Sequence, residues 1–364
     1  MSWFTFYEIT GASVPTPATS QASIFINSAT GQPSYKDDTG TVTSLVGAVS
    51  ITGWTNSLNT SGVNATTNVS CWLASGGSTN QAACIQPKGN GPWLAQLPDG
   101  TATGGDARGV QAFDGQLVRS FASEVAQGDQ SVLLGAYSRA GAMAAVAIGY
   151  GNVVNDQYGA SVGGTGNISG YCAFSTGLSN VSQGQYSFSA GQGNAADAEN
   201  GWIPGGLGAT TRGTFGAGAR ASGFFVSQGD CQDRVFKFRV ATSNATQATS
   251  TTNGAAASTT NQIILPDGSA FVVKGTINVR EAATGDSSAW DFTAYIKRGA
   301  GAGTTAMVAA CTPTLIAQDA GAATWAVAVD ADTTNGGLRC RVTGQASHDL
   351  KWSWSIYSCN EVVG

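Results

Sequence analysis

Hydrophobic and polar positions repeat every 14 residues between about residues 130 and 225. One column of positions is always glycine, and the column three residues earlier is always apolar. The glycines are Gly135, Gly149, Gly163, Gly177, Gly191 and Gly205, and the apolar residues are Val132, Val146, Ala160, Phe174, Phe188 and Trp202. Residues before each glycine alternate as in a strand, and those after it favour turns. The pattern predicts stacked coils, each made of a short strand, a turn and a second strand.

Stacking places each repeated position in one column along the axis of such a roll. We expect the apolar column to fill the interior, where burial of each large side chain contributes about 1.5 to 3 kcal/mol. We expect the glycines at sharp corners or where a neighbouring backbone approaches closely, because glycine inside a strand costs backbone entropy. Polar turn residues are expected to display their amides to solvent. These are Asn152, Asn155, Asn180 and Gln183.

Alternation with a period of two dominates residues 263–364. Trp325, Val327 and Val329 alternate with small residues, and a turn containing Asn335-Gly336 follows. Further alternating apolar residues come after it, and these are Leu338, Cys340, Val342, Leu350, Trp352, Trp354 and Ile356. This pattern predicts an antiparallel β-sandwich. Residues 226–262, rich in Ala, Thr, Ser and Asn from Ala241 onward, predict an extended connector.

Composition narrows the possible functions. The chain has 364 residues, of which 50 are glycine, 42% are hydrophobic and only 11% are charged. This hydrophobic content excludes a disordered chain, so we expect an all-β protein. A net charge of -5 with 17 scattered Lys and Arg residues argues against nucleic-acid binding. We identify no secretion signal and no membrane span, because no cationic leader and no run of 18 apolar residues occurs.

The seven cysteines lie far apart and form no C-x-x-C pair. This dispersion predicts reduced, buried thiols, with a Cys71–Cys84 disulfide as the alternative. Without a neighbouring histidine, a zinc site is excluded, and we expect no cofactor and no metal.

Four carboxylates before the repeats are the best candidates for catalysis, and these are Asp99, Asp106, Asp114 and Glu124. Cleavage of a glycan would require a pair about 5 to 9.5 Å apart. Asp99 starts an ordinary turn, and structural ion pairs of Asp106 with Arg108 or Asp114 with Arg119 are the simpler interpretation. We therefore expect no catalytic residue and no enzyme. The glycine-rich segment 104–109 lacks the ending of a phosphate loop and predicts a tight strand crossing.

The C-terminal region offers three further candidates. His348 is the one histidine, and without a G-x-S-x-G elbow it predicts a loop residue. Asp330, Asp332 and Asn335 resemble part of a calcium loop but lack the closing Glu, so they predict a hairpin end. Trp352 and Trp354 could stack on receptor sugars, although their alternation favours the core or a subunit interface. The candidate contacts with a receptor are therefore the loop residue His348 and, as the less favoured interpretation, Trp352 and Trp354.

Five segments carry a resemblance to known proteins. The unit from Ala145 to Asn152 (AVAIGYGN) resembles the 14-residue repeats of trimeric adhesin heads and phage fibres, which form trimeric left-handed β-rolls. The block from Pro87 to Gly128 is similar to a stretch of phage tail fibres. The segments Val14–Pro17 and Pro33–Val42 resemble phage fibre N-termini, and the region from Trp290 through Trp352 looks like a C-terminal fibre module.

The resemblance implies an elongated homotrimeric fibre of a tailed bacteriophage, located on the exterior of the virion. Its expected parts are a virion-attachment segment (1–45), a β-rich transition domain (46–129), the β-roll (130–225), the connector (226–262) and the sandwich (263–364), which would be the receptor-binding tip. The expected partners are two further copies of the chain, a phage capsid or tail protein, and a bacterial surface glycan or protein. A tail fibre that attaches to the host is the first hypothesis. The alternatives are a head fibre or capsid decoration protein, and a glycan-degrading tailspike.

Overall fold

The computed structural model describes residues 8–30, 32–44, 54–58, 70–74, 87, 89–164 and 168–364. About 45% of the chain is strand and 2% is helix, so the predicted all-β class is confirmed. The chain divides into two units, Met1–Ile85 and Gln86–Gly364. In the described part of the chain, no helix has both the length and the apolar character that a membrane crossing requires.

The first unit contains a small four-stranded sheet in the order β1-β2-β3-β4 and a separate antiparallel pair. The strands are β1 (Glu8–Ile9), β2 (Ser23–Asn27), β3 (Gln32–Lys36), β4 (Val42–Ser44), β5 (Trp54–Leu58) and β6 (Ser70–Ala74). Val14 and Phe25 are buried against this sheet, and Lys36 Nζ donates a 2.7 Å hydrogen bond to the carbonyl oxygen of Val14. Asp37 closes the β3–β4 turn, so the expected strand and turn are present. The possible Cys71–Cys84 disulfide lies outside the described side chains.

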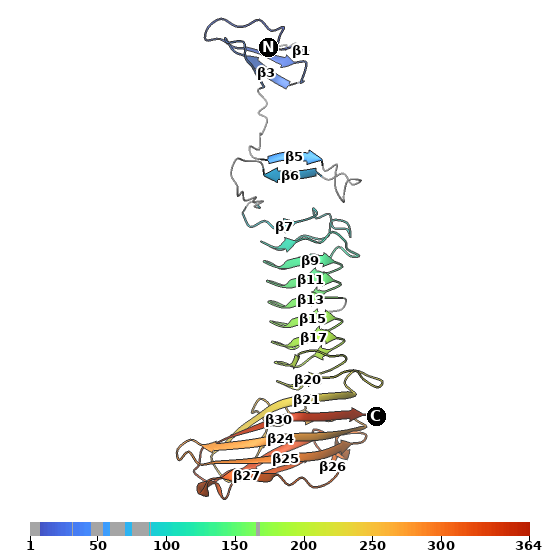
Figure 1. Cartoon of the computed structure of the whole chain (residues 1–364), viewed down its shortest axis with the longest axis vertical. Helices are drawn as coiled ribbons and strands as arrows, with labels where there is room; N and C mark the ends of the chain where they lie inside the picture. Colours follow the sequence, from blue (N-terminus) through green and yellow to red (C-terminus); the bar gives the residue numbers. More distant parts are fainter. Residues whose placement is uncertain are drawn as a thin grey trace. The chain divides into compact units, whose positions relative to one another are not determined.

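The second unit begins with a β-solenoid, so the predicted stack of coils is present (Figure 1). One parallel sheet contains β7 (Trp93–Leu94), β8 (Phe113–Asp114), β9 (Val132–Ala136), β11 (Val146–Tyr150), β13 (Ala160–Gly163), β15 (Phe174–Leu178), β17 (Phe188–Gln192), β19 (Trp202–Ile203) and β20 (Gly218–Arg220). A second contains β10 (Arg139–Ala140), β12 (Val153–Val154), β14 (Ile168–Ser169), β16 (Val181–Ser182) and β18 (Ala195–Ala196). Coils of irregular length, β7 and β8, extend the stack N-terminal to the expected start at residue 130.

The interior of the roll differs from the expectation. The fully buried column lies one residue later than predicted and contains Leu133, Ala147, Ser161, Ser175, Ser189 and Ile203. The predicted core column of Val132, Val146, Phe174, Phe188 and Trp202 lies on the opposite face of the strands, and Phe174 and Trp202 are 38% and 44% exposed. Successive strand residues point to opposite faces, so only one of two adjacent columns can face inward. Small residues occupy most of that column, and the Ser182 and Ser189 hydroxyls lie 2.7 Å apart.

The repeated glycines allow neighbouring coils to stack closely, as predicted. Gly149 has φ of +119°, and a Cβ there would lie 2.1 Å from the carbonyl oxygen of Gly163 in the next coil. The same holds from Gly135 through Gly191, but not at Gly205, where a Cβ would meet nothing within 4 Å. Gly206 takes the equivalent position, with φ of +105° and a Cβ 2.2 Å from Ala221 O. The coil between Gly191 and Gly206 therefore carries one extra residue, and the expectation for Gly205 is wrong.

An internal asparagine at the corner of a coil links it to the next coil. Asn180 Nδ2 donates to Thr176 O in its own coil and to Gly191 O in the next, each at 2.6 Å. Its Oδ1 accepts a 2.9 Å bond from the backbone N–H of Asn194, which repeats the arrangement. Asn152 and Asn180 are fully buried, contrary to expectation, whereas Asn155 and Gln183 are exposed as expected. Backbone groups left free by the sharp corners are satisfied in this way.

The C-terminal module is a two-sheet sandwich, as predicted. The first sheet continues the roll in the order β20-β21-β30-β24-β25-β26, with β27 on β25. The second has the order β22-β29-β23, with β28 on β29. The strands are β21 (Cys231–Thr242), β22 (Gln247–Ser250), β23 (Ile263–Ile264), β24 (Ser269–Glu281), β25 (Ser287–Arg298), β26 (Ala306–Met307), β27 (Thr314–Gln318), β28 (Ala326–Asp332), β29 (Gly337–Thr343) and β30 (Leu350–Val363), with short 3-10 helices η1 (Ala302–Thr304) and η2 (Ala320–Ala322).

The segment expected to be an extended connector contributes to this module. Strand β21 pairs with β20 and β30, and β22 pairs with β29. Phe236 and Phe238 of β21 are buried in one core with Phe271, Val342 and Trp354. The Ala- and Thr-rich composition obscured this strand, because its alternating apolar residues precede the low-complexity stretch. The module therefore begins near residue 231.

Candidate functional site

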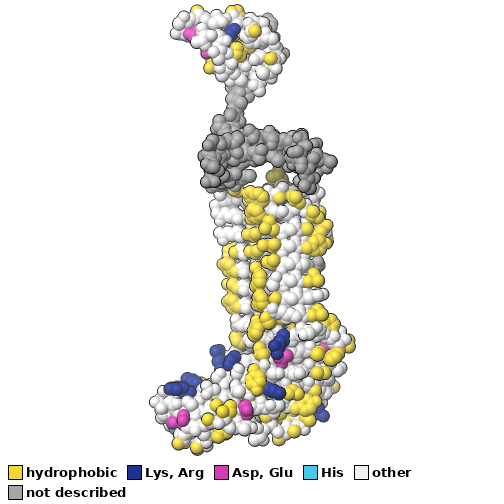
Figure 2. Space-filling model, in the orientation of Figure 1, with side chains coloured by type: hydrophobic (Ala, Val, Ile, Leu, Met, Phe, Trp, Pro, Cys, Tyr) yellow, Lys and Arg dark blue, Asp and Glu magenta, His cyan; other side chains and the backbone are white. Residues whose placement is uncertain are grey.

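The roll presents a continuous apolar surface, which we call the outer column: Val132, Val146, Ala160, Phe174, Phe188 and Trp202. These residues are in register across parallel strands, and the rings of Phe174 and Phe188 stack with centroids 5.8 Å apart. Leu134, which is 39% exposed, lies on the same face of β9 as Val132. Figure 2 shows apolar side chains running along the roll. Parallel sheets are normally covered on both faces, so this surface has the character of an interface.

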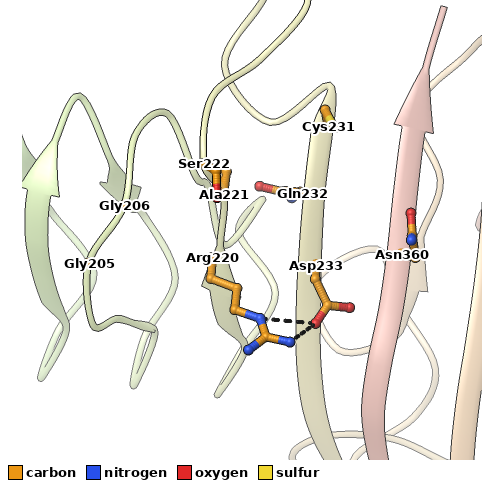
Figure 3. Close-up of a pocket in the computed structure, with 9 residues that line it drawn as sticks. All are labelled: Gly205, Gly206, Arg220, Ala221, Ser222, Cys231, Gln232, Asp233 and Asn360. Carbon is orange, nitrogen blue, oxygen red and sulfur yellow. Dashed lines mark hydrogen bonds and ion pairs between the residues drawn. The ribbon is translucent and has the colours of Figure 1, made fainter.

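A cleft lies where the roll meets the module, and we call it the junction cleft. A cavity of about 480 Å³ is lined by Arg220, Gln232, Asp233 and Asn360 among others (Figure 3). An adjoining cavity of about 190 Å³ shares Arg220 and Asp233 and adds Trp202 and Tyr357. A third, of about 310 Å³, continues from Trp202 and Tyr357 to Lys237. Half-exposed aromatic rings beside amides and charged groups are the side chains that bind sugars in open clefts.

Three polar side chains of the cleft, those of Arg220, Asp233 and Gln232, already have partners in the protein. Arg220 Nη2 lies 3.0 Å from Asp233 Oδ2, and Figure 3 shows the guanidinium turned toward the carboxylate. The other oxygen of Asp233 accepts bonds from the Ser358 hydroxyl and the Cys359 backbone. Gln232 is buried, and its amide donates a 2.8 Å bond to Glu361. The Arg220 side chain is 75% exposed, so a ligand in the cleft can reach it.

The acidic residues that the sequence suggested for catalysis make structural contacts in the first coils of the roll. Asp114 is fully buried between Arg108 at 2.7 Å and Arg119 at 3.3 Å. The predicted Asp114–Arg119 pair is therefore present. The expected Asp106–Arg108 ion pair is not, because Arg108 Nη1 donates instead to the backbone carbonyl of Asp106.

The other two carboxylates organise turns. Asp99 accepts from the backbone and hydroxyl of Thr101, and these bonds lower the pKa of its carboxyl. Glu124 Oε2 accepts a 2.6 Å bond from the backbone of Ser120. The glycine-rich segment 104–109 is a tight crossing, as predicted, because a Cβ at Gly104 would lie 2.2 Å from Leu97 O.

The predicted receptor tryptophans lie in the core. Trp352 and Trp354 are 2% and 0% exposed, and the Trp352 indole donates a 2.9 Å bond to the Thr242 hydroxyl. The favoured interpretation of both as core residues is therefore confirmed, and the receptor-contact alternative is wrong, because alternation along β30 turns both rings inward. His348 lies in a loop, as predicted, with Nδ1 2.9 Å from Glu281 Oε1. Glu281 has a lowered pKa because Thr284 donates a hydrogen bond to it and His348 lies beside it.

The segment that resembled a calcium loop is a hairpin end, as predicted. Asp332 accepts bonds from the backbone of Thr334 and Asn335 and closes the turn between β28 and β29. Asp330 pairs with Arg339 and Arg341 on the neighbouring strand. Among the residues that the structure describes, no group of three or more His, Cys, Asp or Glu side chains is arranged to hold a metal ion.

The sequence analysis missed a set of cations on the C-terminal sheet. Lys237, Arg239, Lys274, Arg280 and Lys351 are exposed at alternate positions of β21, β24 and β30. They look scattered along the chain, yet each of them except Arg239 stands between two buried residues of its strand. The sequence signal for this set is the alternation of charged with apolar residues within each strand.

Among the cysteines that the structure describes, Cys340 and Cys359 are buried free thiols, and burial raises the pKa of both, whereas Cys231 is exposed.

Comparison with known proteins gives weak structural similarity. No family model and no curated protein matches the chain. It is similar to the tailspike protein gp49 of Acinetobacter baumannii bacteriophage Fri1, a capsular polysaccharide depolymerase, with 8% identity and a TM-score of 0.19 over 65% of this chain and 49% of that one. It is also similar to the tailspike of Acinetobacter baumannii phage AM24, with 11% identity and a TM-score of 0.20 over 74% and 52% of the two chains. The chain thus spans about half the length of either tailspike.

These similarities contradict one expectation. The chain was expected not to be an enzyme, but the solved structures that it resembles are tailspikes, and one is a depolymerase. We withdraw that expectation. Identities and TM-scores at this level do not transfer an activity or a substrate to this chain.

Proposed function

We propose that this chain is a structural fibre protein of a tailed bacteriophage, a homotrimeric tail fibre that attaches the virion to the surface of the host. The observation that carries the proposal is the uncovered outer column of the roll. Its side chains lie on one face of a parallel sheet, and burial of each large one contributes about 1.5 to 3 kcal/mol. Association of rolls through this face would remove it from water. The number of copies, three, is the one implied by the resemblance to fibre repeats.

In this proposal the N-terminal unit and the C-terminal module have different binding partners. The N-terminal unit would dock on a capsid or tail protein, as the similarity of Val14–Pro17 and Pro33–Val42 to fibre N-termini implies. The C-terminal module and the junction cleft would meet a surface glycan or protein. Three linked copies would convert weak single contacts into avid attachment, because the second and third contacts form at high effective concentration.

Native mass spectrometry of the purified chain tests the assembly. A trimer is expected for the wild type, and Phe174→Ser combined with Phe188→Ser should shift it toward monomer, because two large apolar side chains leave the interface. Leu97→Ser is the matched control, since Leu97 is 80% exposed in a loop outside the outer column. A wild-type monomer at micromolar concentration would contradict the proposal.

Two further measurements separate the alternatives on the virion. Antibody against residues 8–44, imaged on intact particles, labels the tail for a tail fibre and the capsid for a head fibre. Incubation with purified host capsule, followed by sizing of the polymer, reports the depolymerase activity that a tailspike would have.

A further inference from the structure

Cations gather on the outer face of the first sheet of the C-terminal module. Lys237 and Arg239 of β21, Lys274 and Arg280 of β24, and Lys351 of β30 are all exposed, and the residues beside them in each strand are mostly buried. We call these five residues the basic face. Figure 2 shows that the visible lysine and arginine side chains of the second unit lie on the C-terminal module or at its junction with the roll.

Strand register brings the members of the basic face together. Arg280 stands directly opposite Lys351 across the β24–β30 pair, and Lys351 is opposite Ala241, two residues from Arg239. Like charges directly opposite in a sheet destabilise it. Stability of the fold therefore does not explain this arrangement, and a ligand that supplies negative charge would relieve it.

Carboxylates near the basic face only partly neutralise it. Asp349 Oδ1 lies 2.8 Å from Lys351 Nζ, and both side chains of this pair are more than half exposed. Asp291, on the same face of β25, is opposite Thr276. These two carboxylates therefore offset only part of the positive charge of the basic face, in a chain whose net charge is -5. Such a local reversal of sign attracts and retains anions.

The basic face extends past the roll. Strand β20 pairs with Asp233, Arg234 and Val235 of β21, so the stretch from Lys237 to Ala241 runs beyond that pairing. Between the cations lie small polar side chains that can bond to sugar hydroxyls: Ser353, Ser355, Thr276 and Asn278. Lys237 also lines the junction cleft together with Tyr357, whose ring is 53% exposed. The cleft and the basic face therefore form one continuous surface.

We propose that the basic face binds an anionic polysaccharide, one whose sugars carry carboxylate groups at regular intervals. A flat sheet with several separated cations suits an extended polymer that makes many weak ionic contacts, while hydroxyl and amide groups contact the sugar rings. This inference rests on the proposed function, because it names the chemistry of the surface polymer that the fibre would meet. Repetition of the face in three copies would raise the avidity further.

Binding of sodium alginate, a polymer of uronic acids, to the immobilised full-length chain tests the proposal, with neutral dextran as the reference polymer. Alginate should bind and dextran should not, and alginate binding should weaken as salt increases, because exposed charges are screened. The variant K237Q/R239Q/K351Q should bind alginate about tenfold more weakly, since each exposed ion pair contributes modestly. Arg339→Gln, a change of partly exposed charge on β29 of the second sheet, should leave affinity within about twofold.

Each outcome bears on the proposal. Lack of alginate binding at low salt, or equal binding by the triple variant and the wild type, overturns it. Equally tight, variant-sensitive binding of duplex DNA of matched charge overturns it in favour of a nucleic-acid surface. Circular dichroism confirms that the variants are folded. If the protein is a trimer but does not bind alginate, only this inference is contradicted. If it is a monomer that binds alginate, only the proposed assembly is contradicted.

Discussion

Arg212 Nε lies 3.1 Å from Glu361 Oε2, so the last coils of the roll are tied to the last strand of the C-terminal module. Arg234 contacts the other oxygen of the same carboxylate, and both Arg234 and Glu361 are fully buried. Gln232 donates a further bond to Glu361. One carboxylate therefore holds together residues that are separated by more than a hundred positions in the chain.

Replacement of Glu361 by Gln should destabilise the second unit by about 3 kcal/mol or more, because the buried Arg234 guanidinium loses its counter-charge. Thermal or denaturant unfolding followed by circular dichroism measures the loss. Asp349→Asn is the control, since it removes an exposed pair whose contribution is about 1 kcal/mol or less. Equal stability of the two variants would show that the buried cluster does not anchor the junction.

Gly149→Ala should destabilise the roll by about 2 kcal/mol or more, because the new Cβ meets the backbone of the next coil in a left-handed conformation that alanine disfavours. Gly205→Ala is a matched control in the same glycine column of the sequence. It has open space around a Cβ and should change stability by less than about 0.5 kcal/mol. Unfolding curves of the two variants give the comparison, and the same loss for both would refute close stacking as the reason for the repeat.

Asn180→Ala should cost about 2 kcal/mol, because the carbonyls of Thr176 and Gly191 and the N–H of Asn194 each lose the hydrogen bond that the Asn180 side chain makes to them. Hydrogen exchange of the Asn194 amide, measured by mass spectrometry, should quicken in the variant. Asn155→Ala changes an exposed turn residue of the same type and should leave both quantities unchanged. Unchanged exchange at Asn194 in Asn180→Ala would contradict the bridging role.

Period and alternation in the sequence were enough to predict the roll and the sandwich, but not which face of the roll strands points inward. Phe174 and Ser175 are neighbours in one strand, and the larger apolar residue was the natural choice for a core. Coils this narrow bury mainly small residues such as Ala147, Ser175 and Ser189, and the serine hydroxyls bond within the stack, so most of the bulky residues lie outside. The basic face was missed for a related reason. Lys351 and Arg280 are 71 positions apart in the sequence, and only strand register places them opposite each other.

Stability of the C-terminal module should depend on the ionisation of Glu281. Thr284 Oγ1 donates a 2.7 Å bond to its carboxylate, and His348 lies beside it, and both lower its pKa below the ordinary value of 4.5. A depressed pKa in the folded state means that the ionised carboxylate stabilises the fold above pH of about 4.5, and that this contribution disappears as pH falls through the folded-state value.

The difference in melting temperature between wild type and Glu281→Gln should therefore narrow as pH falls from about 6 to 3. Comparing the two proteins removes the effect of other carboxylates with lowered pKa, such as Asp332, which titrate in both. Thr284→Val removes the interaction that lowers the pKa of Glu281 most, while the Glu281 charge stays in place. In this background, the difference in melting temperature that Glu281→Gln produces at pH 6 should be smaller than in the wild-type background. A gap that stays constant over this range would mean that Glu281 acts through packing and not through its charge.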